Sequence, residues 1–188
     1  SNTFINVNLN TSEGSLLAGS TYDSASMLNY DVGLNQGLSN STAHIMVTVE
    51  GNTTNTALSS GTPAVMNVGT NSVTQNFQRF TSTTDAEVTY VGTKDIYATI
   101  LASINYDKQG GGSDDYNFYF YKKQPGGSYS QLPGAVAKIG SVGGNDYSNL
   151  NLTYATTFTS GSSLTIYIEN PSSNDDMRVT DLQFVVKE

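Results

Sequence analysis

The chain has 188 residues, no Cys, no Trp and a net charge of −8. Without Cys it can form neither a disulfide nor a thiolate metal site. Its eight basic residues are scattered, whereas nucleic acid and anionic membranes are bound through clustered Lys and Arg, which argues against both as partners. No apolar run approaches the roughly 18 residues that a membrane span needs.

Hydrophobic residues make up 37% of the chain and charged residues only 13%, about half the usual charged share. Ser, Thr, Asn and Gly take the place of the missing charges. A disordered chain would combine low hydrophobicity with high net charge. The composition indicates a β-protein whose surface is covered by hydroxyl and amide groups, and its 12 Tyr and 7 Phe add to the β-propensity.

Apolar and polar residues alternate with a period of two through much of the chain, which predicts strands. Turn residues such as Gly110-Gly111-Gly112 and Pro125-Gly126-Gly127 separate them. The predicted strands are Phe4–Leu9, Ile45–Glu50, Ala64–Val68, Val73–Phe80, Ala86–Val91, Ile96–Tyr106, Asp115–Tyr121, Ala135–Ile139, Tyr147–Ala155, Ser163–Glu169 and Arg178–Lys187. Many short strands with frequent turns predict a sandwich or a barrel, and of these we favour an all-β, two-sheet antiparallel sandwich.

The organisation of the chain is expected to change near Thr70, where the composition shifts slightly. Residues 1–70 are interpreted as an N-terminal arm or as extra strands, with a long polar segment over residues 11–43. A loop of that length usually serves a function or a partner contact. Residues 71–188 are interpreted as the sandwich.

Strand parity gives several strands a second, Tyr-bearing face. An ordinary sandwich strand has one buried and one solvated face, and Tyr can simply lie on a wet surface. The alternative is a subunit interface, because interfaces are enriched in Tyr and poor in Lys and Glu. The candidate interface residues are Tyr97, Leu101, Tyr119, Tyr121 and Tyr167.

The segment from about residue 77 to 187 resembles the tumour-necrosis-factor-like jelly roll found at the tips of phage and virus fibres and spikes. The resembling segments are Arg79–Thr84, Glu87–Gly92, Ile96–Ile104, Tyr116–Lys123, Ser163–Asn170 and Val179–Val186. The resemblance implies jelly-roll topology, a homotrimer with aromatic residues along its three-fold axis, and an extracellular or virion-surface role. The stalk or collagen-like stretch that usually precedes such a domain is not found here.

Signals for catalysis are poor, and we expect no enzyme activity. The single His, His44, stands at the start of a strand, and no Gly-x-Ser-x-Gly elbow accompanies it. Glu50, Glu87 and Glu169 lie on predicted strands, but nothing in the sequence pairs them as glycoside hydrolysis requires. Phosphate-binding loops and zinc spacings are also missing from the sequence.

If the strands after Ile96 alternate in direction, the loops over 107–115, 140–146 and 170–176 share one end of the sandwich, opposite Lys122 and Lys123. Such Gly-rich loops are free to recognise a ligand. The predicted ligand-binding tip comprises Tyr106, Asp114, Asp115, Tyr116, Asp146, Tyr147, Asp175 and Asp176. Clustered carboxylates also suit calcium, the alternative to an expectation of no cofactor, although Asp is common in turns anyway.

The sequence therefore predicts a structural protein of a virion or phage surface, as a fibre or spike tip or a capsid decoration. It would assemble as a homotrimer with other virion proteins and bind a host-surface glycan or receptor. The alternative is a carbohydrate-binding or lectin-like domain of a secreted bacterial protein, in which Tyr side chains stack on sugar rings. The mass in solution separates the two, because a trimer favours the first and a monomer the second.

Overall fold

A computed structural model describes residues 42–69, 72–82, 84–143 and 147–188. The predicted strand Phe4–Leu9, nearly all of the long polar segment and Asp146 lie outside these residues. The predicted strands within them all coincide with observed strands, at least in part. No helix in the described part of the chain is long and apolar enough to cross a membrane.

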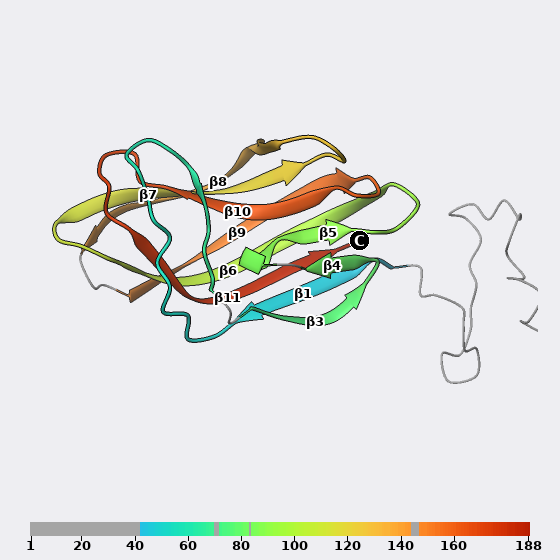
Figure 1. The fold of residues 1–188 in the computed structure, drawn as a ribbon, viewed down its shortest axis with the longest axis horizontal. Coiled ribbons are helices and arrows are strands. Elements are labelled where there is room, and N and C mark those ends of the chain that lie inside the picture. Colours follow the sequence, from blue (N-terminus) through green and yellow to red (C-terminus); the bar gives the residue numbers. More distant parts are fainter. Residues whose placement is uncertain (1–41, 70–71, 83, 144–146) are drawn as a thin grey trace, which may run out of the picture. The chain divides into compact units, whose positions relative to one another are not determined.

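Two antiparallel sheets form a sandwich (Figure 1). The first has five strands, in the order β3 (Ser72–Gln78), β1 (His44–Val49), β11 (Met177–Lys187), β6 (Ile96–Lys108) and β9 (Tyr147–Phe158). The second has six, with the path β4 (Phe80–Ser82), β5 (Val88–Tyr90), β10 (Ser163–Glu169), β7 (Ser113–Lys123) and β8 (Tyr129–Gly143), and with β2 (Ala64–Val65) paired to β10. A 3₁₀ turn, η2 (Thr84–Ala86), precedes β5.

The core lies between the two sheets because each strand turns alternate residues inward. On β6 the inward residues Ala98, Ile100 and Ile104 are at most slightly exposed, and on β7 Phe118 and Phe120 are fully buried. Aromatic pairs join the layers: the ring centroids of Phe120 and Phe184 are 6.0 Å apart, and those of Tyr106 and Phe118 are 5.7 Å apart. The predicted parity of β6 and β7 is therefore confirmed.

The sandwich begins well before residue 71, contrary to the domain boundary predicted from composition. Strand β1 is hydrogen-bonded between β3 and β11, and its residues Ile45 and Val47 are fully buried. Residues 40–188 form one compact unit.

The predicted strand Val73–Phe80 is two strands that belong to different sheets. The chain leaves the first sheet after Gln78 and enters the second at Phe80. Arg79, between them, has a φ of 59°, a left-handed conformation that interrupts a strand. The apolar positions change parity across this corner, from Val73 and Phe77 to Phe80, and the predicted single strand ignored that change.

Candidate functional site

The three loops predicted to share one end do so. Lys108 at the end of β6 contacts Asp114 and Asp175 from two of the loops. The third lies beside them, because Tyr147 pairs with Asp107 and Gly143 pairs with Ser113. Lys122 and Lys123 lie at the other end, where they pair with Leu164 and Ser163. We call the first end the loop end; it includes the β6–β7 hairpin at the left of Figure 1.

Lys108 is the centre of the loop end, although it played no part in the sequence-based prediction. Its side chain is fully buried, and its ammonium lies 2.8 Å from Asp114 Oδ2 and 2.9 Å from Asp175 Oδ2. It also donates to the carbonyl oxygens of Gly111 and Gly112, at 2.7 and 3.0 Å. The sequence signal was the run of three Gly residues, 110–112, with Lys108 two positions before it and Asp114 two positions after it.

The ammonium of Lys108 supplies the positive charge that the calcium alternative assigned to a metal ion. The hydrogen bond from Lys108 holds the pKa of Asp114 below its usual value, against the opposing effect of burial. Burial acts to lower the pKa of Lys108, but the hydrogen bonds and charges of Asp114 and Asp175 together outweigh it and leave the pKa raised. In the described residues no group of three or more carboxylate or imidazole side chains is arranged to hold a metal.

Two of the Tyr residues assigned to the ligand-binding tip are core residues. Tyr106 is 2% exposed and Tyr116 fully buried, so neither ring can stack on a ligand. The Tyr116 hydroxyl donates to the backbone oxygen of Asp175, and burial raises its pKa to about 12. Tyr147, at 72% exposure, is the Tyr of the predicted tip that faces solvent.

The remaining acidic residues of the loop end also contribute to the internal structure. Asp176 Oδ1 accepts the backbone N–H of Leu58 at 3.0 Å. Asp107, which is almost fully buried, forms a bidentate pair with Arg178. Asp115 is exposed and lies close to Gly140. The carboxylates are therefore bound mainly by groups of the protein itself.

We expect a metal chelator to leave the melting temperature unchanged, because Lys108 already neutralises the pair Asp114 and Asp175. Calorimetry with millimolar EDTA, and separately with added calcium chloride, measures this. A rise in melting temperature with calcium, reversed by the chelator, would show that a cation site exists and would contradict the expectation.

The predicted interface residues divide between two opposite faces of the sandwich. Tyr97 and Leu101 lie on β6, on the outer face of the five-stranded sheet, and are 66% and 47% exposed. Tyr119, Tyr121 and Tyr167 lie on β7 and β10, on the outer face of the six-stranded sheet, and are only partly exposed. The sequence placed both sets on outward faces but could not assign those faces to different sheets.

The outer face of the five-stranded sheet carries an apolar patch. In the register, Leu101 pairs with Val185 on one side and with Thr153 on the other, and Val185 pairs with Met46. Tyr97 lies four residues before Leu101 on the same face of β6. We call this surface, centred on Tyr97 and Leu101, the apolar patch. Large exposed hydrophobic residues that gather on one sheet face are typical of an interaction surface.

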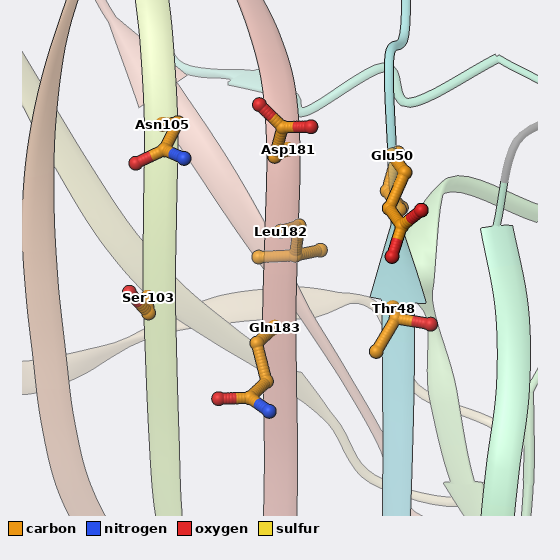
Figure 2. A pocket seen from close by; sticks show the side chains of 8 residues that line it. Thr48, Glu50, Ser103, Asn105, Asp181, Leu182 and Gln183 are labelled. Carbon is orange, nitrogen blue, oxygen red and sulfur yellow. The ribbon is translucent and has the colours of Figure 1, made fainter.

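A polar groove of about 400 Å³ crosses the same sheet nearer to the loop end (Figure 2). It is lined by Thr48 and Val49 of β1 and by Glu50, which follows β1. The other lining residues are Ser103 and Asn105 of β6 and Asp181, Leu182 and Gln183 of β11. A β-bulge between Val179 and Asp181 breaks the register there. The Asn52 amide donates to Val179 O, and Gly51 N–H donates to Asp181 Oδ1, which attaches the segment after β1 to the bulge.

Four Tyr side chains form a continuous row on the outer face of the six-stranded sheet. The rings of Tyr121 and Tyr167 are stacked with centroids 3.9 Å apart, with Tyr119 at 6.3 Å from Tyr121 and Tyr129 at 6.0 Å from Tyr167. We call these four residues the tyrosine row. The sequence analysis omitted Tyr129, because β8 was predicted to begin at Ala135 and the structure starts it at Tyr129.

Carboxylates flank the tyrosine row. Glu169 accepts hydrogen bonds from the Tyr119 hydroxyl and from the Asn117 amide. At the other end Glu87 lies 3.7 Å from the Lys123 ammonium, which is 4.8 Å from the centroid of the Tyr129 ring. Burial, and to a lesser extent the hydrogen bond to Glu169, raises the pKa of Tyr119 to about 12. The phenols are therefore neutral at physiological pH.

The candidate catalytic residues are not brought together. Glu87 immediately precedes β5, whose Val88 pairs with Leu164 near the start of β10, and Glu169 ends β10. Continued by one residue, this register sets Glu87 opposite Thr165, four positions before Glu169. Four positions correspond to about 13 Å along a strand, whereas paired glycosidase carboxylates lie roughly 5–9.5 Å apart. His44 begins β1 and Glu50 follows its last residue, so the two are separated by the length of that strand, which belongs to the other sheet.

No protein-family model matches the chain, and no curated protein matches it. A solved structure does share its fold. The Eiger TNF of S. frugiperda is 14% identical, with a TM-score of 0.52 over 78% of this chain and 93% of that one. Murine APRIL at pH 8.0 is 10% identical, with a TM-score of 0.46 over 77% of this chain and 99% of that one. The chain is thus an all-β, two-sheet sandwich with a TNF-like jelly-roll fold, as the sequence predicted.

Proposed function

We propose that the chain is a surface structural protein that assembles as a homotrimer through its five-stranded sheet and presents its six-stranded sheet for recognition. The observation that carries the assembly half is the apolar patch, where Tyr97 and Leu101 are 66% and 47% exposed on a sheet face. Cyclic trimers bury a different patch on each side of every subunit, so this face needs only a complementary surface on the next copy. The TNF-like fold supports the same reading, because trimers are typical of it.

The assembly half is tested by the mass in solution. Light scattering at micromolar concentration is expected to give about 60 kDa, three times the 20.0 kDa of one chain. The apolar patch provides the physical reason, since an exposed apolar surface is stabilised by burial at roughly 25 cal/mol per Å². A mass of about 20 kDa at every concentration tested would remove the trimer and favour a monomeric binding module.

We place this protein outside the cell, on the surface of a virion or phage or as part of a secreted assembly, and we propose that it acts without catalysis. A surface rich in hydroxyl and amide groups with few charges supports an exposed, non-enzymatic role, and the wide separation of Glu87 and Glu169 gives no support to glycoside hydrolysis. Attachment to a host and decoration of a capsid are both roles that such a trimer could fill.

The second candidate function is that of a carbohydrate-binding or lectin-like domain. The tyrosine row favours it, because four aromatic rings lie in contact on one solvent-facing sheet surface, between Glu169 and Glu87. The two candidates are compatible when the apolar patch mediates assembly, since the tyrosine row lies on the other sheet. A monomer that binds a glycan would contradict the trimer and would support only the second candidate function.

A further inference from the structure

We infer that the tyrosine row is a binding site for a neutral saccharide, and that recognition takes place on the outer face of the six-stranded sheet instead of at the loop end. The inference rests on the recognition half of the proposed function and not on assembly. Its first support is negative: at the loop end Tyr106 and Tyr116 are buried, and Lys108 neutralises Asp114 and Asp175. The surface that combines aromatic rings with hydrogen-bonding groups is the tyrosine row.

The rings of the row are preorganised. Tyr121 and Tyr167 stack at an interplanar angle of 21°, and Tyr119 meets Tyr121 edge-on at 77°. The Tyr119 hydroxyl is held by Glu169. Tyr offers a large, amphipathic contact area at a low cost in conformational entropy. Rings that already support one another lose little further freedom when a ligand binds, which favours affinity.

Charge pairing indicates a neutral ligand. The carboxylate of Glu169 is engaged by Tyr119 and Asn117, and that of Glu87 by Lys123. A charged ligand would have to compete with these internal partners. The phenols themselves are neutral, because burial raises the pKa of each Tyr in the row.

The two strands that carry Tyr119, Tyr121 and Tyr167 turn only polar or aromatic side chains outward. Every outward side chain on β10, and every one from Asn117 to Lys123 on β7, carries a hydroxyl, amide or charged group, and none is aliphatic. Those that reach the surface are Asn117, Tyr119, Tyr121, Lys123, Tyr167 and Glu169, whereas Ser163 and Thr165 are buried. A pyranose ring has apolar C–H faces and a rim of hydroxyl groups, so it matches a surface of this composition.

The site is tested with the full-length chain and four probes: maltotriose, cellotriose, mannotriose and, as an anionic comparison, sialyllactose. Binding is measured by saturation-transfer NMR and by titration of the intrinsic fluorescence, which comes from 12 Tyr because the chain has no Trp. At least one neutral trisaccharide is expected to bind. Tyr121→Ala and Tyr167→Ala are each expected to weaken that binding about tenfold or more, as removal of an anchoring aromatic residue does.

Matched controls locate the site. Tyr97→Ala on the apolar patch and Tyr147→Ala at the loop end remove rings that are more exposed than those of the row, and neither is expected to change saccharide binding. If an Ala variant fails to fold, the unsubstituted chain labelled with 3-fluorotyrosine provides the same information. The ¹⁹F signals of Tyr119, Tyr121, Tyr129 and Tyr167, assigned with single Tyr→Phe variants, should shift with the trisaccharide while the signal of Tyr147 stays in place.

Several results would overturn the inference. Binding of none of the neutral trisaccharides, binding of sialyllactose alone, or binding that survives both Ala substitutions in the row would each remove it. Loss of binding in Tyr147→Ala would return recognition to the loop end. Light scattering on the same samples separates this result from the assembly proposal: a trimer that binds no saccharide contradicts the inference alone, and a monomer that binds one contradicts assembly alone.

Discussion

Replacing Lys108 with Met is expected to lower the free energy of unfolding by about 3–5 kcal/mol, the usual cost of removing one partner of a buried ion pair. The substitution keeps a side chain of similar length but removes the charge. Asp114 and Asp175 would then face each other without a cation, and the carbonyl oxygens of Gly111 and Gly112 would lose their donor. Urea unfolding, followed by circular dichroism, measures the change.

The control for this prediction is Lys138→Met, which removes the same charge from an exposed position on β8. Surface substitutions usually change stability by less than about 0.5 kcal/mol. A triple variant, Lys108→Met with Asp114→Asn and Asp175→Asn, should recover part of the loss because no buried charge remains unpaired. A Lys108→Met protein as stable as the unsubstituted chain would contradict the interpretation of Lys108 as the centre of the loop end.

The ion pair also predicts how stability depends on pH. The pKa of Asp114 is depressed in the folded state, so its contribution is fully present above the unfolded value of about 3.9 and is lost as the pH falls through the folded value. The raised pKa of Lys108 gives a contribution that is present below about 10.4 and is lost as the pH rises through the folded value. The triple variant should lack both changes.

Local periodicity was sufficient to predict where most strands lie and the direction of most of their side chains, although it missed the corner at Arg79 and the start of β8. On β7, Tyr116, Phe118 and Phe120 alternate with Asn117 and Tyr119, and the structure buries the first set and turns the second outward. This works because the parity of a strand depends only on neighbouring residues. The common end of the three loops was also predictable, since it follows from alternating strand direction.

The partner of each strand in space was not predictable in the same way. Tyr97 and Tyr167 have similar sequence surroundings, yet they lie on different sheets because β6 pairs with β11 and β9 while β10 pairs with β7. Lys108 was missed for a related reason. Its burial depends on Asp175, 67 positions later, whose approach follows from the β10–β11 connection and not from any local pattern.

The apolar patch gives the second large expected effect, the conversion of a trimer to a monomer by a single charge. In Leu101→Lys or Tyr97→Lys, assembly through the five-stranded sheet would have to bury an ammonium without a partner, at a cost of several kcal/mol in each interface. Every 1.4 kcal/mol lowers the association constant tenfold. Light scattering at micromolar concentration should therefore give about 20 kDa for each variant, against about 60 kDa for the unsubstituted chain.

Tyr147→Lys is the matched control for Tyr97→Lys, because it makes the same replacement at a Tyr of similar exposure, 72% against 66%, but at the loop end. It should keep the trimer mass, and so should Tyr167→Lys if the tyrosine row takes no part in assembly. Dissociation by Tyr167→Lys with no effect of Leu101→Lys would instead place the interface on the six-stranded sheet. If both variants dissociate, each subunit presents both faces to its neighbours, and the tyrosine row cannot remain open to a saccharide in the trimer.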